Sequence, residues 1–116
     1  AIAIAHQVTV VNVFHAGDGN LHPNICYDRS DVALVERVEH VSREILEACV
    51  AAGGSITGEH GVGTDKMRYM PLMFDTPTME LMCDVRRAFD RDGRANPGKV
   101  VPVRSCREWK GGGVHD

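Results

Sequence analysis

Aromatic side chains, paired cysteines, excess charge and long apolar runs are all scarce in this sequence. Its 116 residues include only three Phe, two Tyr and one Trp, so the packed core has to rest on Val, Ile, Leu and Met. Thirteen basic and sixteen acidic residues leave a net charge of −3, which excludes the basic footprint of a nucleic-acid-binding protein and a polybasic membrane patch. No apolar run approaches the roughly 20 residues of a transmembrane helix.

The cysteines occur singly, at Cys26, Cys49, Cys83 and Cys106. Without a C-x-x-C pair, a thiolate zinc site or a thioredoxin-like motif has little support. Isolated cysteines in apolar surroundings are typical of a reducing compartment, so we expect a cytoplasmic protein.

Glycine and histidine are the residue types present in excess. Twelve Gly and six His occur, and three of the histidines lie within glycine clusters. Apolar residues at 43% and charged residues at 25% are ordinary for a globular domain, and the length suits one modest domain.

Two strands are predicted near the N-terminus. Residues Gln7–Phe14 are rich in β-branched side chains, and Leu21–Tyr27 alternates between apolar and polar positions. Asp18-Gly19 between them favours a two-residue type I′ turn, which needs positive φ at both positions. Pro23 cannot donate to a ladder, which indicates an edge strand or a bulge.

This turn would fix the register of the hairpin. Gly17 would face Asn20, and His15 would face His22 on one surface, with Asn24 beside them. Directly opposed Cβ atoms are roughly 4.5–5.5 Å apart, and two imidazoles at that separation can share one metal ion.

Helical periodicity predicts one long helix from about Asp31 to Ala52. Ser30 or Asp31 can cap its start, and Gly53-Gly54 can cap its end. Residues 55–63 are expected to form a short strand that enters a glycine-rich loop. A second helix is predicted from Thr76 to Gly93, with inward side chains at Met79, Met82, Cys83 and Phe89. The expected fold is α+β: a small antiparallel sheet with a β-hairpin and two main helices packed on one face.

A third metal ligand is available in the second glycine cluster. Glu59 offers a carboxylate between glycines that allow close approach of the backbone, and the adjacent His60 is an uncommitted imidazole that can accept a proton near neutral pH. Two His and one carboxylate leave open metal positions, as catalytic sites require. The same residues also fit simpler interpretations: an ordinary turn at residues 17–20, and an anion-binding nest of backbone amides at residues 58–63.

Three motifs in series carry a family resemblance. FHAGDGNLHP (Phe14–Pro23), GEHGVG (Gly58–Gly63) and NPGKV (Asn96–Val100) resemble the C-terminal part of FAD-linked oxidases of the glycolate oxidase and D-lactate dehydrogenase type. The resemblance spans roughly Val8 to Cys106. It implies a C-terminal domain over residues 1–106 that binds metal and substrate. The glycine run at residues 111–113 predicts a mobile tail at 107–116.

The resemblance implies a role for each matching residue. His15, His22 and Glu59 correspond to ligands of a divalent metal such as Zn, Mn or Fe. His60 corresponds to the catalytic base and Asn24 to a residue near the substrate. The segment that contains Asn96 and Lys99 lies near the flavin in such proteins.

The resemblance further implies oxidation of a 2-hydroxy acid to a 2-oxo acid, with a quinone or a carrier flavoprotein as electron acceptor. FAD would be bound mainly by a separate domain, in the same or a partner chain. The sequence contains no such domain, so we expect a fragment or separate subunit that is inactive alone and self-associates through exposed apolar surface. Such a chain would be cytoplasmic, or peripheral to a membrane through partner subunits.

The sequence also fits two other functions. One is a stand-alone metalloenzyme with a two-His, one-carboxylate site, although such enzymes usually need a many-stranded barrel. The other is a non-enzymatic interaction module.

Overall fold

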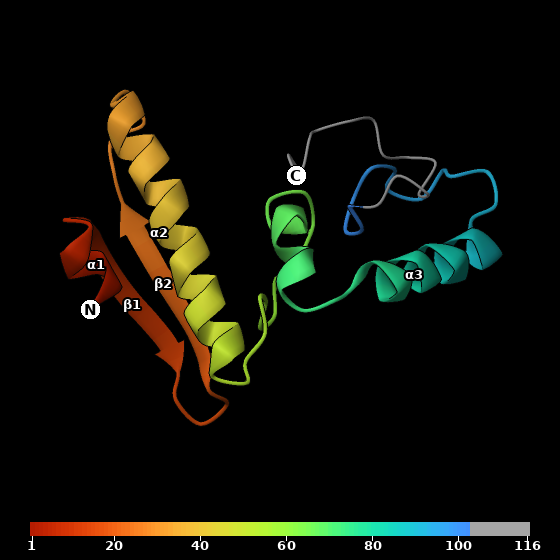
Figure 1. The fold of residues 1–116 in the computed structure, drawn as a ribbon, viewed down its shortest axis with the longest axis horizontal. Coiled ribbons are helices and arrows are strands. Elements are labelled where there is room, and N and C mark those ends of the chain that lie inside the picture. Colours follow the sequence, from red (N-terminus) through yellow and green to blue (C-terminus); the bar gives the residue numbers. More distant parts are fainter. Residues whose placement is uncertain (103–116) are drawn as a thin grey trace. The chain divides into compact units, whose positions relative to one another are not determined.

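A computed structural model describes residues 1–102 of the chain (Figure 1). The elements in order are α1 (Ile2–Ala5), β1 (Thr9–His15), β2 (Asn20–Cys26), α2 (Val32–Ala51), the 3-10 helix η1 (Met67–Leu72) and α3 (Thr76–Phe89). The α+β class with an antiparallel hairpin is confirmed. The chain divides into two compact units, residues 1–58 and the part from Glu59 onward. The packing of both helices on one sheet face and the boundary at residue 106 stay predictions, and the tail at 107–116 lies outside the described residues.

The hairpin loop differs from the predicted two-residue turn. Residues 16–19 form a four-residue loop, in which the Asp18 N–H donates to the His15 carbonyl at 3.0 Å. Gly19 has a φ of 68°, whereas Asp18 is not in the left-handed region that a type I′ turn requires at both central positions. The predicted turn is therefore wrong.

The register is displaced by two residues from the predicted one. His15 pairs with Asn20, and His22 pairs with Val13 rather than with His15. Because side chains alternate with a period of two, a shift of two residues leaves every side chain on its predicted face. His15 and His22 consequently share a face, as diagonal rather than direct neighbours. Pro23 lies opposite Asn12 without a bulge, in a sheet that has only two strands among residues 1–102.

Helix α2 begins and ends at the caps that the sequence predicts. The Asp31 carboxylate accepts the Leu34 N–H at 3.0 Å, which satisfies a free donor of the first turn. After the helix, Gly53 has a φ of 85° and the Gly54 N–H donates to the Cys49 carbonyl at 2.9 Å. This left-handed glycine cap ends the helix. Figure 1 shows α2 running alongside the hairpin.

The core of the first unit is small. Helix α1 contacts both α2 and β1, and the buried apolar side chains are Val38, Val41 and Ile56. The hairpin keeps apolar side chains more than half exposed on both faces, namely Val11, Val13, Phe14 and Leu21. The expected exposed apolar surface is therefore present in this unit, whereas self-association stays a prediction.

Helix α3, in the second unit, begins at a carboxylate cap and buries two of its side chains. The Asp75 carboxylate accepts the Thr78 N–H at 3.0 Å, with a proline in the first turn as predicted. Met79 and Cys83 are buried. The prediction that Phe89 points inward is wrong, because it is the last residue of the helix and is 90% exposed. The helix ends before Gly93 because the chain turns at Asp90.

The glycine-rich segment does not form the expected strand. Residues 55–63 have no partner strand and run as bends and loop. The 3-10 helix η1, which contains Pro71, has no counterpart in the sequence prediction. No helix among residues 1–102 is long and apolar enough to cross a membrane.

Candidate functional site

Two histidines meet on one face of the hairpin. His15 is the last residue of β1 and His22 lies within β2. Their ring centroids are 5.4 Å apart and the ring planes meet at 78°. His15 is exposed and His22 is half-buried. Two imidazoles at this separation, one of them open to solvent, can supply two nitrogen ligands to a single metal ion.

The backbone at Gly58 passes close to Asn20 of the hairpin. A Cβ atom on Gly58 would lie 2.2 Å from Oδ1 of Asn20, and Asn20 is the cross-strand partner of His15. Glycine thus lets residue 58 pass the hairpin without displacing Asn20. Glu59, the next residue along the chain, begins the second compact unit.

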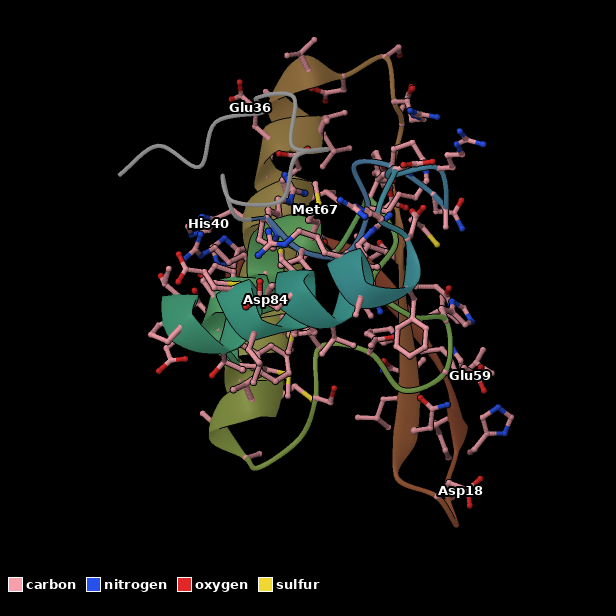
Figure 2. All side chains as sticks on the ribbon, turned by 90° about the vertical axis from the view of Figure 1, so that its right-hand side faces the viewer. Asp18, Glu36, His40, Glu59, Met67 and Asp84 are labelled. Carbon is pink, nitrogen blue, oxygen red and sulfur yellow. The ribbon has the colours of Figure 1, made fainter. Side chains whose placement is uncertain are left out.

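Two residues near the histidines have different roles. Asp18 lies at the tip of the hairpin loop (Figure 2), which fits its role as a turn residue. Asn24 shares the face of His22, and its side-chain amide donates to the His22 carbonyl at 3.1 Å. Asn24 is exposed, so its amide lies at the surface beside the histidine pair.

In the second unit, two of the sequence motifs meet at one hollow of about 280 Å³. The hollow is lined by His60, the loop of residues 61–66, and Lys99. The Val100 N–H donates to the Gly63 carbonyl at 2.9 Å and ties the two segments together. The lining carries the imidazole of His60, the ammonium groups of Lys66 and Lys99, and the carboxylate of Asp65.

His60 is not the isolated imidazole that the sequence suggests. Its Nε2 lies 3.5 Å from Oε1 of Glu59, and both side chains are exposed. A carboxylate at this distance can orient the ring of a neighbouring histidine. His60 is therefore open to solvent and has a carboxylate as its neighbour.

Sequence reasoning missed Arg86, which holds the segment of Asn96 and Lys99. Its Nη1 donates to the Lys99 carbonyl at 3.1 Å, its Nη2 donates to the Asn96 carbonyl at 2.7 Å, and Nη2 also donates to Ala95. Asn96 has a φ of 47°, an uncommon conformation outside glycine. On α3 the arginine resembles an ordinary solvent-facing residue, and no local pattern reveals its distant carbonyl partners.

Asp90 fixes the start of the same segment. Its Oδ1 accepts the Arg94 N–H at 2.9 Å and its Oδ2 accepts the Ala95 N–H at 2.7 Å. The hydrogen bond from Ala95, followed by that from Arg94, lowers the pKa of Asp90, and the charge of Arg86 adds to this effect. The carboxylate form is the one that holds the loop.

This pKa predicts an acid-sensitive loop. Because the folded-state pKa lies below the ordinary value of 3.8, the stabilisation is complete above that value and is lost as the pH falls through the folded-state pKa. We expect Asp90→Asn to weaken the loop at pH 7 and to flatten the acid limb of the stability curve. Urea unfolding at several pH values tests this, with the nearby Asp92→Asn as control. An unchanged acid limb in Asp90→Asn would contradict it.

The chain matches known proteins along most of its length. Residues 1–100 match the family described as FAD linked oxidases, C-terminal domain. The chain is 43% identical to the glycolate oxidase subunit GlcD of Escherichia coli K12 over 111 residues, which cover 95% of this chain and 22% of the relative. It is 33% identical to the mitochondrial D-lactate dehydrogenase [cytochrome] of Arabidopsis thaliana over 94 residues, which cover 81% and 17%.

The matched segment covers most of this chain but only a small part of each relative. The chain spans about a fifth of the length of the curated proteins it resembles, including the glycolate oxidase subunit GlcD of Bacillus subtilis at 39% identity. The family match nevertheless includes both histidines of the hairpin and both glycine-rich motifs. The chain therefore belongs to the C-terminal domain family of FAD-linked oxidases.

Proposed function

We propose that this chain is the metal- and substrate-binding C-terminal portion of an FAD-dependent 2-hydroxyacid dehydrogenase of the glycolate or D-lactate type. The observation that carries the proposal is the pair of imidazoles of His15 and His22, 5.4 Å apart on one hairpin face. Family membership supports the link to FAD. The names of the relatives support the class of substrate.

His15, His22 and Glu59 are the proposed ligands of a divalent cation, which we assign to Zn, Mn or Fe. Two imidazoles and one carboxylate fit these ions and leave positions open for substrate oxygens. When bound, such a cation supplies Lewis-acid chemistry that lowers the pKa of a coordinated hydroxyl group. Because His15 is exposed and His22 is only half-buried, a small hydroxy acid can reach the two histidines from solvent.

The proposed base is His60. It accepts the hydroxyl proton of the 2-hydroxy acid while the C2 hydrogen leaves as hydride, so that the alcohol becomes a 2-oxo group and two electrons are released. A flavin held by an FAD-binding part would serve as the acceptor of that hydride. The exposed imidazole of His60 can pass the proton on to solvent, and the carboxylate of Glu59 at 3.5 Å can orient the ring.

The remaining assignments rest on position. Asn24, exposed on the face of His22, is proposed to contact the substrate. Asn96 and Lys99 are proposed to lie on the flavin side, in a segment that Arg86 and Asp90 hold in place. Because one relative is named as a subunit of glycolate oxidase, we propose assembly with an FAD-binding part and electron transfer to a quinone or carrier flavoprotein.

Metal-dependent binding of a hydroxy acid tests the proposal. Glycolate is titrated calorimetrically into the chain with and without Mn²⁺, and acetate, which lacks the 2-hydroxyl group, serves as the matched control ligand. We expect glycolate to bind only with metal, and acetate to bind at least about tenfold more weakly, because one contact to a charged centre is worth about 1.5–3 kcal/mol. Equal binding of glycolate without metal, or of acetate with metal, would contradict the proposal.

A further inference from the structure

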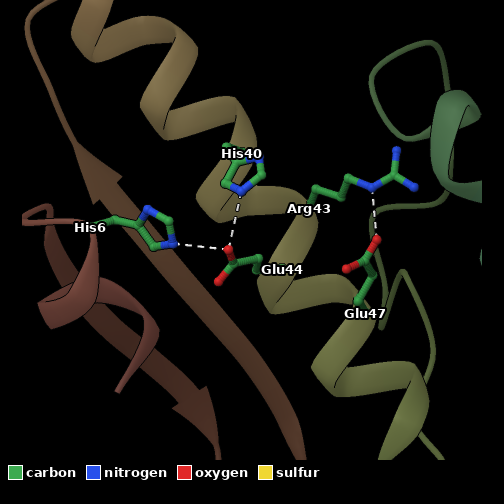
Figure 3. Close-up of polar contacts among 5 residues, drawn as sticks. All are labelled: His6, His40, Arg43, Glu44 and Glu47. Carbon is green, nitrogen blue, oxygen red and sulfur yellow. Dashed lines mark hydrogen bonds and ion pairs between the residues drawn. The ribbon is translucent and has the colours of Figure 1, made fainter.

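A second cluster of two histidines and one glutamate lies apart from the hairpin pair. Figure 3 shows His6, at the end of α1, and His40, on α2, both pointing at the carboxylate of Glu44. The Nε2 atoms of His6 and His40 lie 2.9 Å and 3.2 Å from the same oxygen, Oε1 of Glu44. The two rings stand 5.4 Å apart between centroids. All three residues belong to the first unit.

The elements that carry these side chains fix their directions. His40 and Glu44 are four residues apart on α2, so they share one face of the helix. His6 is the C-cap of α1, where Val8 N–H donates to the Ala3 carbonyl at 3.0 Å. Gln7 follows with a φ of 54°, in the position where helix ends usually place glycine. This strained residue directs the chain so that His6 faces α2.

We propose that His6, His40 and Glu44 bind a second divalent transition-metal ion of the Zn²⁺ class. With bonds of 2.0–2.1 Å in a tetrahedral arrangement, ligand atoms lie about 3.3 Å apart. The two nitrogen–oxygen distances, 2.9 Å and 3.2 Å, are close to this value, and all three ligand atoms lie within 4.8 Å of one another. His6 and Glu44 are half-buried and His40 is exposed, so one coordination position is open to water.

The ligand chemistry selects the class of ion. Two imidazoles and a single carboxylate oxygen suit Zn²⁺, whereas Ca²⁺ and Mg²⁺ prefer sites built entirely from oxygen. An ion bound here would link the end of α1 to the middle of α2. Its effect would therefore be structural, because it adds a cross-link between two elements that already contact each other.

An ordinary ion pair on the same helix provides the matched control. Arg43 Nε lies 2.7 Å from Glu47 Oε1, also with a spacing of four residues (Figure 3). Glu47→Gln removes the same charge from α2 as Glu44→Gln, but it leaves all three proposed ligands in place. His40→Ala replaces an exposed helical residue with the best helix former, so the helix is retained.

The test counts Zn²⁺ ions retained by the full chain after dialysis against trace metal and measures affinity by competition with a chelator. We expect two ions per chain in the wild type and in Glu47→Gln. We expect His40→Ala and Glu44→Gln to retain one ion. Their affinity for the second ion should be at least tenfold weaker than that of the wild type. Zn²⁺ should also raise the melting temperature of the wild type more than that of His40→Ala.

A His15→Ala series separates this inference from the proposed function. If only the hairpin site failed, the wild type would bind one ion that is lost in His40→Ala and kept in His15→Ala, which supports the second site. If His40→Ala and Glu44→Gln bound as many ions as the wild type, with equal affinity, the second site would be refuted. The His15→Ala result would then still report on the hairpin site alone.

Discussion

Replacement of His15 by alanine is expected to abolish metal binding at the hairpin. Loss of partners that only orient a metal ligand typically costs 10–100-fold in affinity, so loss of one of three ligands is expected to cost at least about 100-fold. His15 is exposed at the end of β1, and its removal leaves no cavity. Calorimetric titration with Zn²⁺ measures the effect as the loss of one binding event.

Asn12→Ala is the matched control for this variant. Asn12 is an exposed residue of the same strand on the opposite face, so its removal changes the strand surface without touching the histidine pair. We expect it to bind Zn²⁺ as the wild type does. If His15→Ala kept the full number of binding events at unchanged affinity, the ligand assignment on the hairpin would be wrong.

Replacement of Met79 by alanine is expected to have the largest effect on stability. Met79 is 4% exposed in α3, and truncation of such a buried side chain costs about 2–5 kcal/mol through lost burial and the remaining cavity. Because α3 also carries Arg86, which holds the carbonyls of residues 95–99, the variant should loosen this segment as well. Urea unfolding monitored by circular dichroism measures the free energy of unfolding.

Leu81→Ala tests whether burial is the cause. Leu81 lies two residues away on the same helix and is 62% exposed, so its truncation should change the free energy of unfolding by no more than about 0.5 kcal/mol. If both variants lost the same stability, the assignment of the α3 core face would be wrong. If neither did, α3 would contribute little to the stability of its unit.

Local signals explain which parts of the fold could be predicted. Helix α2 has a carboxylate cap at Asp31 and a left-handed glycine at Gly53, and both act within a few residues of the chain. The hairpin loop is predicted wrongly: Asp18-Gly19 favours a two-residue turn, whereas the structure has a four-residue loop at residues 16–19. The shared face of the two histidines is nevertheless predictable, since a shift of two residues preserves side-chain alternation.

Long-range contacts explain what could not be predicted. Arg86 acts on carbonyls 9 to 13 residues away, and no spacing in the sequence marks such contacts. Phe89 follows the apolar pattern of α3 but lies where the helix ends, so periodicity alone could not place it. His6 reaches Glu44 only because α1 ends beside α2. The positive φ of Gln7 could not be predicted either, because glutamine seldom adopts that conformation.

X-ray absorption at the zinc edge tests the central claim most directly. The chain is loaded with one equivalent of Zn²⁺ in a His40→Ala background, so that the ion occupies the hairpin site alone, and spectra are recorded before and after addition of glycolate. We expect scattering from two imidazole rings together with oxygen ligands, and a change in the oxygen shell when glycolate is added. A spectrum without imidazole scattering, or one that glycolate leaves unchanged, would contradict it.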